Sequence, residues 1–223
     1  CSSDLTIQPL LETLHAALTI GYLDDLTLGG HQSEVAKDVE RVMEVGGSLG
    51  LTLNISKCEL IADPATTVHD PFLQRFQRIA VQDSSLLGAP LFPGSILDSY
   101  WADRCADLSR AIDRLSLIGS QDALLLMRAS FSAPRVQHLL RCSPSVDNAA
   151  LAVFDNLLRS ALNRITNCDM SDLQWLQASL TVKEGGLGVR RVAALALPAF
   201  LASAASTQLL QESILSSRTC QPD

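Results

Sequence analysis

The sequence predicts an α+β protein that is predominantly helical. Short runs rich in Leu, Ile, Thr and Tyr, which are typical of strands, occur only before Gly94. After Gly94 the apolar residues recur at helical spacing. Aromatic residues make up only 4% of the chain, whereas Leu and Ala are abundant, which favours helix packing over a β-sandwich. We therefore expect a mixed unit of β-hairpins and helices over residues 1–94, followed by an all-helical unit over residues 95–223.

Composition and charge narrow the class of protein. The 223 residues are 47% hydrophobic, which supports a core and argues against wholesale disorder. The net charge is −7; the first 94 residues hold five basic and twelve acidic side chains, and the remainder hold twelve of each. No block is strongly basic, which argues against a free-standing, tight nucleic-acid-binding module. Six scattered cysteines without a Cys-x-x-Cys pair predict reduced thiols in an intracellular protein, nuclear or cytoplasmic.

The first half alternates helical and extended segments. Ser3 or Asp4 is suited to cap the first helix, and Gly29-Gly30 ends the second strand of the hairpin that follows. In order, we expect a helix over 5–17, a hairpin over 18–29, an amphipathic helix over 33–49, a strand over 55–61, a loop over 62–71 and a tight hairpin or turn over 86–93.

The second half is expected to contain helices alone. Gly119, Pro134 and Pro144 separate the earlier ones, and a Gly-Gly-Leu-Gly segment precedes the last. The last one holds the longest apolar run, 192–205, which falls short of the ~18 residues of a membrane span. We therefore expect a buried helix there and no membrane association. The predicted helices are 96–117, 121–131, 133–140, 146–165, 171–178 and 189–215.

The two adjacent carboxylates Asp24 and Asp25 are the first candidate site. They lie at the predicted tip of the hairpin over residues 18–29. Two-residue hairpin loops favour Asn-Gly, Asp-Gly or Gly-X, and Asp-Asp is none of these. Adjacent carboxylates repel unless a cation lies between them or one is protonated. A metal-binding tip and an ordinary solvated turn both account for the pair.

The order of motifs along the chain resembles one family. Tyr22-Leu23-Asp24-Asp25 precedes a helix, then comes Gly50-Leu51-Thr52-Leu53-Asn54-Ile55-Ser56-Lys57-Cys58, and then Leu87-Gly88-Ala89-Pro90. A Gly-Gly-Leu-Gly segment follows at residues 185–188. The series is similar to the C-terminal half of the palm, and the thumb, of reverse transcriptases (RNA-directed DNA polymerases) of non-LTR retrotransposons. The likeness extends over nearly the whole chain.

The resemblance implies metal chemistry and a substrate site. It implies that Asp24, with Asp25 beside it, holds Mg²⁺ for two-metal nucleotidyl transfer. It places Tyr22 near the incoming dNTP, Lys57 beside the leaving pyrophosphate, and Gly88 against the primer. A solvated lysine and a plain turn are the alternatives for Lys57 and Gly88. The partners would be an RNA or DNA template–primer.

Other polar and aromatic residues have plainer interpretations. Cys58 is expected to be a small core residue, and Trp101 and Trp175 to pack in the core. We expect one or two arginines to reach template–primer phosphates and the rest to pair with Asp103, Asp107 and Asp113 at helical spacing. The arginines considered are Arg104, Arg110, Arg114, Arg128, Arg135 and Arg141.

The sequence departs from the family in one respect. The third metal carboxylate of the family lies on an earlier palm strand, which the chain does not contain; we therefore expect an incomplete catalytic set, two Mg²⁺ ions only in a full-length parent, and no activity of this chain alone. An unpaired edge of the palm hairpin predicts self-association. The alternative is a degenerate or co-opted retroelement remnant that binds nucleic acid or protein without catalysis.

Overall fold

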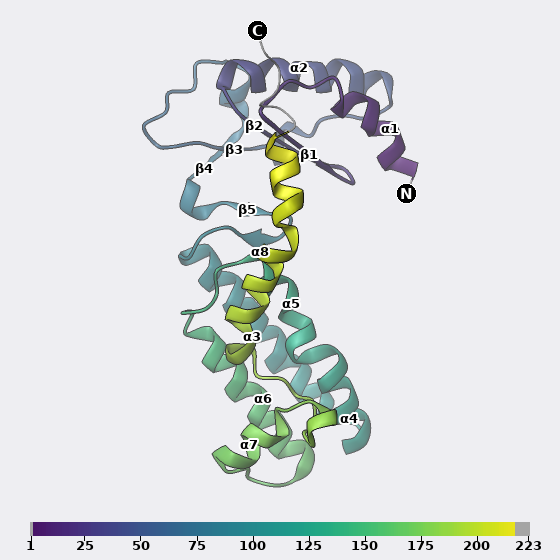
Figure 1. Cartoon of the computed structure of the whole chain (residues 1–223), viewed down its shortest axis with the longest axis vertical. Coiled ribbons are helices and arrows are strands. Elements are labelled where there is room, and N and C mark those ends of the chain that lie inside the picture. The colour runs from purple at the N-terminus through teal and green to yellow at the C-terminus, as the bar shows by residue number, and fades with distance from the viewer. Residues whose placement is uncertain (1, 217–223) are drawn as a thin grey trace. The chain divides into compact units, whose positions relative to one another are not determined.

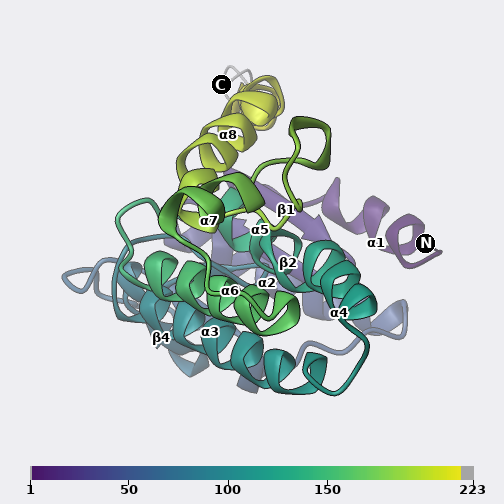
Figure 2. The same cartoon turned by 90° about the horizontal axis from the view of Figure 1, so that it is seen from below.

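The structure, a computed structural model, describes residues 2–216, with side chains described for residues 7–214 (Figures 1 and 2). The chain forms two compact units. The first comprises residues up to 81 together with those from 207 onward, and the second comprises residues 82–206. The described part is mainly helical with three small two-stranded sheets, so the predicted fold class, α+β and predominantly helical, is confirmed at that level.

The first unit contains two helices and two sheets. Strands β1 and β2 form an antiparallel hairpin, whereas β3 and β4 pair in parallel. The three-residue strand β4 was not predicted, because so short a segment shows no alternation of apolar and polar residues. The elements are α1 (Ser2–Leu11), β1 (Leu18–Tyr22), β2 (Asp25–Gly29), α2 (Gln32–Ser48), η1 (Ile55–Lys57), β3 (Glu59–Ile61), η2 (Leu73–Arg75) and β4 (Gln77–Ile79).

Helix α1 ends earlier than the predicted helix over 5–17, and a buried carboxylate gives the reason. Asp38 of α2 is 2% exposed. It accepts hydrogen bonds from the backbone N–H groups of His15, at 2.8 Å, and Ala16, at 2.6 Å. Those two N–H groups are therefore not available to a continuing helix, and the chain turns into β1 at Leu18.

The second unit is a helical bundle with a small hairpin. Helices α3 and α6 lie side by side in both views (Figures 1 and 2). The helices predicted from 96 onward are confirmed, with their ends shifted by a few residues. The elements are β5 (Ser85–Leu86), β6 (Ala89–Pro90), α3 (Ser95–Leu115), α4 (Ser120–Leu126), the π-helical turn η4 (Met127–Phe131), α5 (Ala133–Cys142), α6 (Ala150–Thr166), α7 (Asp172–Ala178), η5 (Val182–Glu184) and α8 (Val192–Ser216).

A pair of packed aromatic side chains lies in the core of this unit. Trp101 of α3 is fully buried and meets Phe154 of α6 edge to face, with ring centroids 6.1 Å apart. Its indole N–H donates to the Ser145 hydroxyl at 3.0 Å, so its one polar atom is satisfied. Trp175 is also buried. Both tryptophans therefore pack in the core, as predicted.

The β5–β6 hairpin belongs to the helical unit, although we expected the composition to change at residue 94. The Ser143 hydroxyl donates to the carbonyl oxygen of Pro90 at 2.7 Å. The His138 ring nitrogen Nε2 lies 3.1 Å from the carbonyl oxygen of Leu87. These two hydrogen bonds attach the hairpin to the end of α5, and the division between the units falls at residues 81 and 82.

Helix α8 is more exposed than predicted. Val192 and Ala196 pack into the core, but Leu197 and Leu201 are 48% and 54% exposed. The expectation of a buried helix over 192–205 is therefore wrong, because only one face of the helix is buried. Among the described residues, the segment Val192–Ile214 is long and apolar enough, by length and composition only, to cross a membrane; its mean hydropathy is 1.5.

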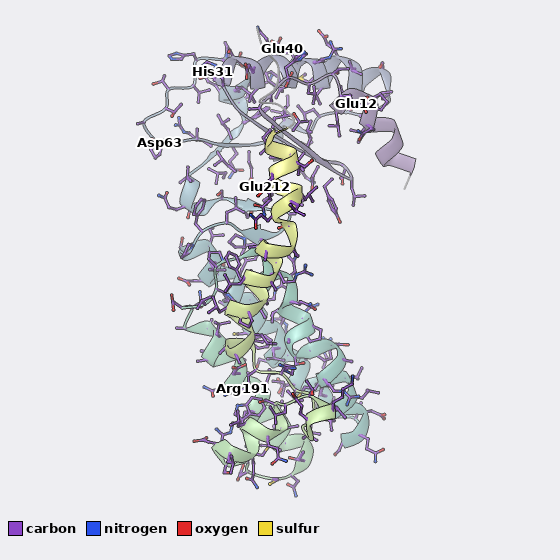
Figure 3. The ribbon with its side chains drawn as sticks, in the orientation of Figure 1. Glu12, His31, Glu40, Asp63, Arg191 and Glu212 are labelled. Carbon is purple, nitrogen blue, oxygen red and sulfur yellow. The ribbon has the colours of Figure 1, made fainter. Side chains whose placement is uncertain are left out.

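A second buried carboxylate fixes the start of α8. Asp155 of α6 is 8% exposed and accepts hydrogen bonds from the backbone N–H groups of Val192, at 2.7 Å, and Ala193, at 3.3 Å. Burial raises the pKa of this carboxyl group, while the two N–H groups and the guanidinium of Arg191, which immediately precedes α8 (Figure 3), oppose that rise. The Asp155 side chain of α6 thus caps the N-terminus of α8.

Replacement of Asp155 should reveal the effects of its hydrogen bonds to α8 and of its raised pKa. We expect Asp155→Ala to lower the free energy of unfolding by about 1–3 kcal/mol, because two N–H groups lose their acceptor. Because the pKa is raised in the folded state, folding is more favourable when Asp155 is protonated. The free energy of unfolding of the wild type, relative to that of Asp155→Asn, should therefore be greatest below pH 3.8, the ordinary pKa, and should fall as the pH rises. Urea denaturation across that range measures the difference, and a difference that grows with pH would contradict the expectation.

The Gly-Gly-Leu-Gly segment closes over the end of α7. The backbone N–H groups of Gly186, Leu187 and Gly188 donate to the carbonyls of Thr181, Ala178 and Leu180. A Cβ at Gly186 would lie 2.2 Å from the carbonyl oxygen of Leu180. Gly185 and Gly188 have φ values of 81° and 76°, in the left-handed region. The glycines are therefore required by the backbone itself.

We expect Gly186→Ala to destabilise the protein by at least about 2 kcal/mol, because the methyl group overlaps backbone atoms that cannot move freely. Gly47→Ala is the matched control. A Cβ at Gly47 in α2 meets nothing within 4 Å, and Ala is favoured over Gly in a helix by about 1 kcal/mol. Thermal denaturation followed by circular dichroism compares the two; equal effects would refute the steric explanation.

Candidate metal site

The candidate carboxylates lie at the end of the β1–β2 hairpin. Leu18 pairs with Gly29 and Tyr22 with Asp25, so the two-residue loop is Leu23-Asp24. The predicted tip, Asp24-Asp25, is wrong by one residue: Asp25 is the first residue of β2. The reason is the pairing of Tyr22 with Asp25, which leaves only Leu23 and Asp24 between the strands.

The loop is conformationally unusual. Leu23 has φ of 56°, in the left-handed region, although it is neither Gly nor Asn. A positive φ at the first loop residue suits the twist of a two-residue hairpin loop, where Gly is the usual choice. Leu23 is 46% exposed, so packing does not explain its place there.

Tyr22, Asp24 and Asp25 are brought together at this end of the hairpin, and all three are exposed. Two neighbouring carboxylates fit one Mg²⁺ ion, which keeps several waters and commonly takes one or two carboxylates together with substrate phosphates. Among the described residues, however, no group of three His, Cys, Asp or Glu side chains gathers to hold a metal ion. The end of the hairpin therefore offers two carboxylate groups that could bind a metal ion.

Lys57 and Cys58 lie together in the first unit, at the end of η1. Lys57 is exposed, with no feature that separates a phosphate-binding role from a solvated one. Cys58 is half-buried, and burial raises the pKa of its thiol. Its Sγ donates to the carbonyl oxygen of Asn54 at 3.3 Å. Cys58 is not among the buried residues of the core, so the prediction of a small core residue is wrong.

Gly88 belongs to the second unit, in the loop between β5 and β6. Leu87 and Gly88 have φ values of 49° and 76°, the pattern of a type I′ turn. A Cβ at Gly88 would meet nothing within 4 Å in the structure. The tight hairpin predicted over 86–93 is thus confirmed, and glycine is needed there for its conformation.

The arginines pair partly as predicted, within α3, and partly across helices. Asp107 binds Arg104 and Arg110 of its own helix and also Arg135 of α5. Asp113 pairs with Arg164 of α6 at 3.5 Å, a partner not predicted. Asp103 forms no ion pair with residues 7–214. Sequence spacing finds pairs within one helix, whereas the contacts with Arg135 and Arg164 depend on how α3 packs in the bundle.

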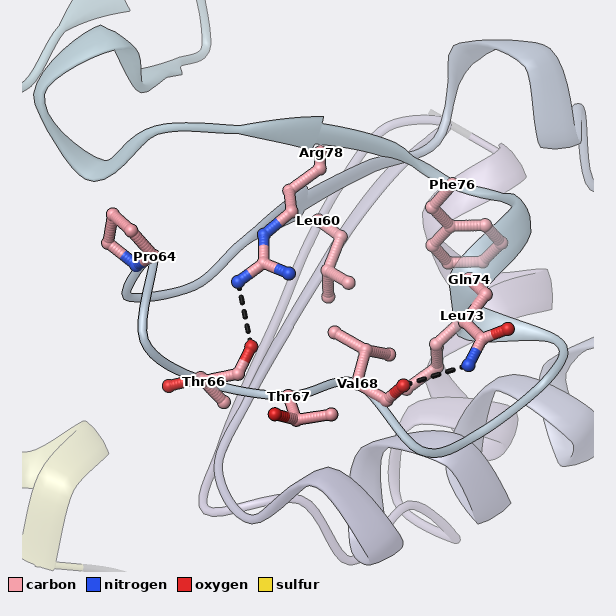
Figure 4. Close-up of a pocket in the computed structure, with 9 residues that line it drawn as sticks. All are labelled: Leu60, Pro64, Thr66, Thr67, Val68, Leu73, Gln74, Phe76 and Arg78. Atoms are coloured by element: carbon pink, nitrogen blue, oxygen red, sulfur yellow. Dashed lines mark hydrogen bonds between the residues drawn. The ribbon is translucent and has the colours of Figure 1, made fainter.

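A cavity in the first unit was not predicted at all. Its volume is about 380 Å³, and the loop over 62–71 closes it against β3 and β4 (Figure 4). The Arg78 guanidinium donates to the carbonyl oxygens of Asp63 and Thr66, and the Gln74 amide donates to that of Val68. These hydrogen bonds to its carbonyl groups hold the loop against η2 and β4.

The chain was compared with protein-family models, with curated proteins and with solved structures, and no match was found.

The strained loop residue gives a direct test of the hairpin. We expect Leu23→Gly to stabilise the protein by about 1 kcal/mol, because glycine adopts positive φ without steric cost. Thr27→Gly, in the interior of β2, is the control and should destabilise it. Chemical denaturation measures both, and destabilisation by Leu23→Gly would show that the leucine side chain has a structural role.

Proposed function

We propose that this chain is part of an RNA-directed DNA polymerase of the non-LTR retrotransposon kind. Residues 1–94 would contribute the C-terminal part of the palm, and residues 95–223 the thumb and a downstream helical region. The reaction of the parent enzyme is template-directed DNA synthesis by two-metal nucleotidyl transfer.

One observation carries the proposal: Tyr22-Leu23-Asp24-Asp25 spans the tight end of an antiparallel hairpin that is followed directly by a helix. The resemblance to reverse transcriptases implies that arrangement. Two further features support it. A second tight hairpin carries Gly88, and a helical bundle follows that hairpin.

The proposed roles follow from chemistry. Bound Mg²⁺ supplies activation of the primer 3′-hydroxyl and neutralisation of the leaving pyrophosphate. Asp24, with Asp25, would hold the ion in a rigid hairpin. Tyr22, 57% exposed, is free to contact the incoming nucleotide or the primer end. The Lys57 ammonium would stabilise charge on the departing phosphates without having to transfer a proton.

The proposal includes inactivity of this chain by itself. The described residues offer two carboxylates at the hairpin and no third metal-binding side chain beside them. The same observation favours the second candidate, a non-catalytic module of retroelement origin that binds nucleic acid or protein. In either case no third strand pairs with the β1–β2 sheet in the described chain, and an unpaired edge strand can associate with another chain.

Primer extension tests the polymerase proposal. We expect no template-dependent synthesis from purified residues 1–223 with Mg²⁺ and dNTPs, and synthesis from a longer chain that adds the preceding in-frame coding sequence. In that longer chain Asp24→Ala should reduce the rate by at least about 100-fold, because metal binding supplies several kcal/mol of transition-state stabilisation. Asp147→Ala, an exposed carboxylate of the second unit, is the control.

The outcomes separate the two candidates. If the longer chain shows no synthesis, the non-catalytic module is favoured. Stop codons or unrelated exons in the preceding DNA would favour it as well. Synthesis by residues 1–223 alone that Asp24→Ala abolishes would overturn the expected inactivity. Binding of a primer–template duplex at low salt, weakening as salt rises, tests nucleic-acid contact separately from catalysis.

A further inference from the structure

The helical unit contains a cavity of about 400 Å³ whose lining combines arginine side chains, called the rim below, with apolar side chains, called the interior. It lies between α3, α4, η4 and α5, and its lining includes Arg110, Arg114 and Arg135 together with Leu115 and Phe131. All of these elements belong to the second unit, so the cavity does not depend on the position of the first.

The rim gathers positive charge in excess of its one carboxylate. Asp107 is 28% exposed at its side chain, and its two oxygens contact the guanidinium groups of Arg104, Arg110 and Arg135, the first and last at 3.4 and 3.2 Å. Arg110 and Arg135 line the cavity together with Asp107, so one of their two positive charges remains uncompensated. Asp107 itself would repel an anion, but it holds these two guanidinium groups in place beside the cavity.

A third arginine of the lining adds to that excess. Arg114 lines the cavity and forms no ion pair with residues 7–214. The neighbouring carboxylate, Asp113, is paired with Arg164 instead. Guanidinium groups present planar forks of N–H donors that match the oxygens of phosphate. A phosphate is therefore a suitable anion for this rim.

The interior is suited to the rest of a nucleotide. Leu115, Leu126 and Phe131 line it, and Phe131 is only half-buried. Aromatic side chains bind nucleobases by stacking, without selecting their sequence. A few convergent polar groups above an apolar cavity of a few hundred Å³ are typical of a small-ligand site.

The backbone beside the cavity is itself unusual. Phe131 ends η4, a five-residue π-helical turn between α4 and α5. Such turns are rare and occur frequently at functional sites. The Ser132 hydroxyl donates back to the carbonyl of Arg128 at 3.1 Å, which satisfies part of the disturbed ladder.

We propose that this cavity binds a nucleotide unit, with its phosphate on the arginine rim and its base in the apolar interior. The source of the unit is either a free nucleotide or one nucleotide of a single strand, and both present the same chemistry. The proposal does not rest on the polymerase assignment, because it concerns side chains of the second unit alone.

Isothermal titration of the full chain at low salt tests it with four probes: AMP, adenosine, inorganic phosphate and a single-stranded oligonucleotide of about 12 residues. AMP should bind at least about tenfold more tightly than phosphate or adenosine, because only AMP uses both parts of the cavity. Tighter binding of the oligonucleotide supports a strand as the source, and equal binding supports a free nucleotide. Equal affinity for AMP and phosphate would overturn the proposal, as would competition by an acidic peptide such as polyglutamate.

Variants locate the site. Arg110→Gln and Arg135→Gln should each weaken AMP binding about tenfold. Arg141→Gln is the matched control: it removes the same charge from the same helix as Arg135, is exposed, and is outside the cavity lining. We expect it to change the affinity by less than about twofold. An equal loss in all three variants would show non-specific electrostatic attraction and overturn the proposal.

A cavity-filling variant separates binding from misfolding. Ala111 of α3 lines the cavity, so Ala111→Leu fills the space for the base while keeping every arginine. Its affinity for AMP should fall to that for inorganic phosphate, with the thermal transition retained. Unchanged AMP binding in a folded Ala111→Leu protein would overturn the placement of the base.

Discussion

A buried carboxylate must accept hydrogen bonds, and this constraint sets the course of the chain in both units. Asp38 and Asp155 are almost fully buried, and each is bound by two consecutive backbone N–H groups rather than by a cation alone. Leaving such a group without partners would cost several kcal/mol. In the first unit the result is the break before β1, and with it the position from which the hairpin begins. In the second unit the result is the start of α8.

The parts of the fold that depend on local pattern were predictable from the sequence. The helices after residue 94 follow their apolar spacing and their Gly and Pro breaks, and the Leu87-Gly88 hairpin follows turn chemistry. The end of α1 was missed because Asp38 lies more than 20 residues away in the sequence from the N–H groups that it binds. The pairing of Asp113 with Arg164 was missed for the same reason, since it depends on a distant segment.

The candidate site was predictable in composition but not in geometry. Tyr22, Asp24 and Asp25 do lie together, but the register of the hairpin puts Asp25 in a strand and a leucine in the loop. A shift of one residue decides which side chains share a face, and it cannot be fixed from two apolar runs alone. The arginine-rimmed cavity gave no signal in sequence, because it joins residues of four helical segments whose spacing along the chain is irregular.

The Gly-Gly-Leu-Gly segment has a consequence for how this protein can change over evolutionary time. Exposed positions such as Arg141 can vary with little effect on the fold, whereas the backbone around Gly186 leaves no space for any side chain. Asp155 is similarly constrained by the two N–H groups that it binds. Sequences that diverge beyond easy alignment should therefore still keep an acidic residue in one helix, a glycine cluster about 30 residues later, and a long apolar helix directly after it. Distant relatives would therefore be found by this pattern of spacing rather than by overall sequence identity.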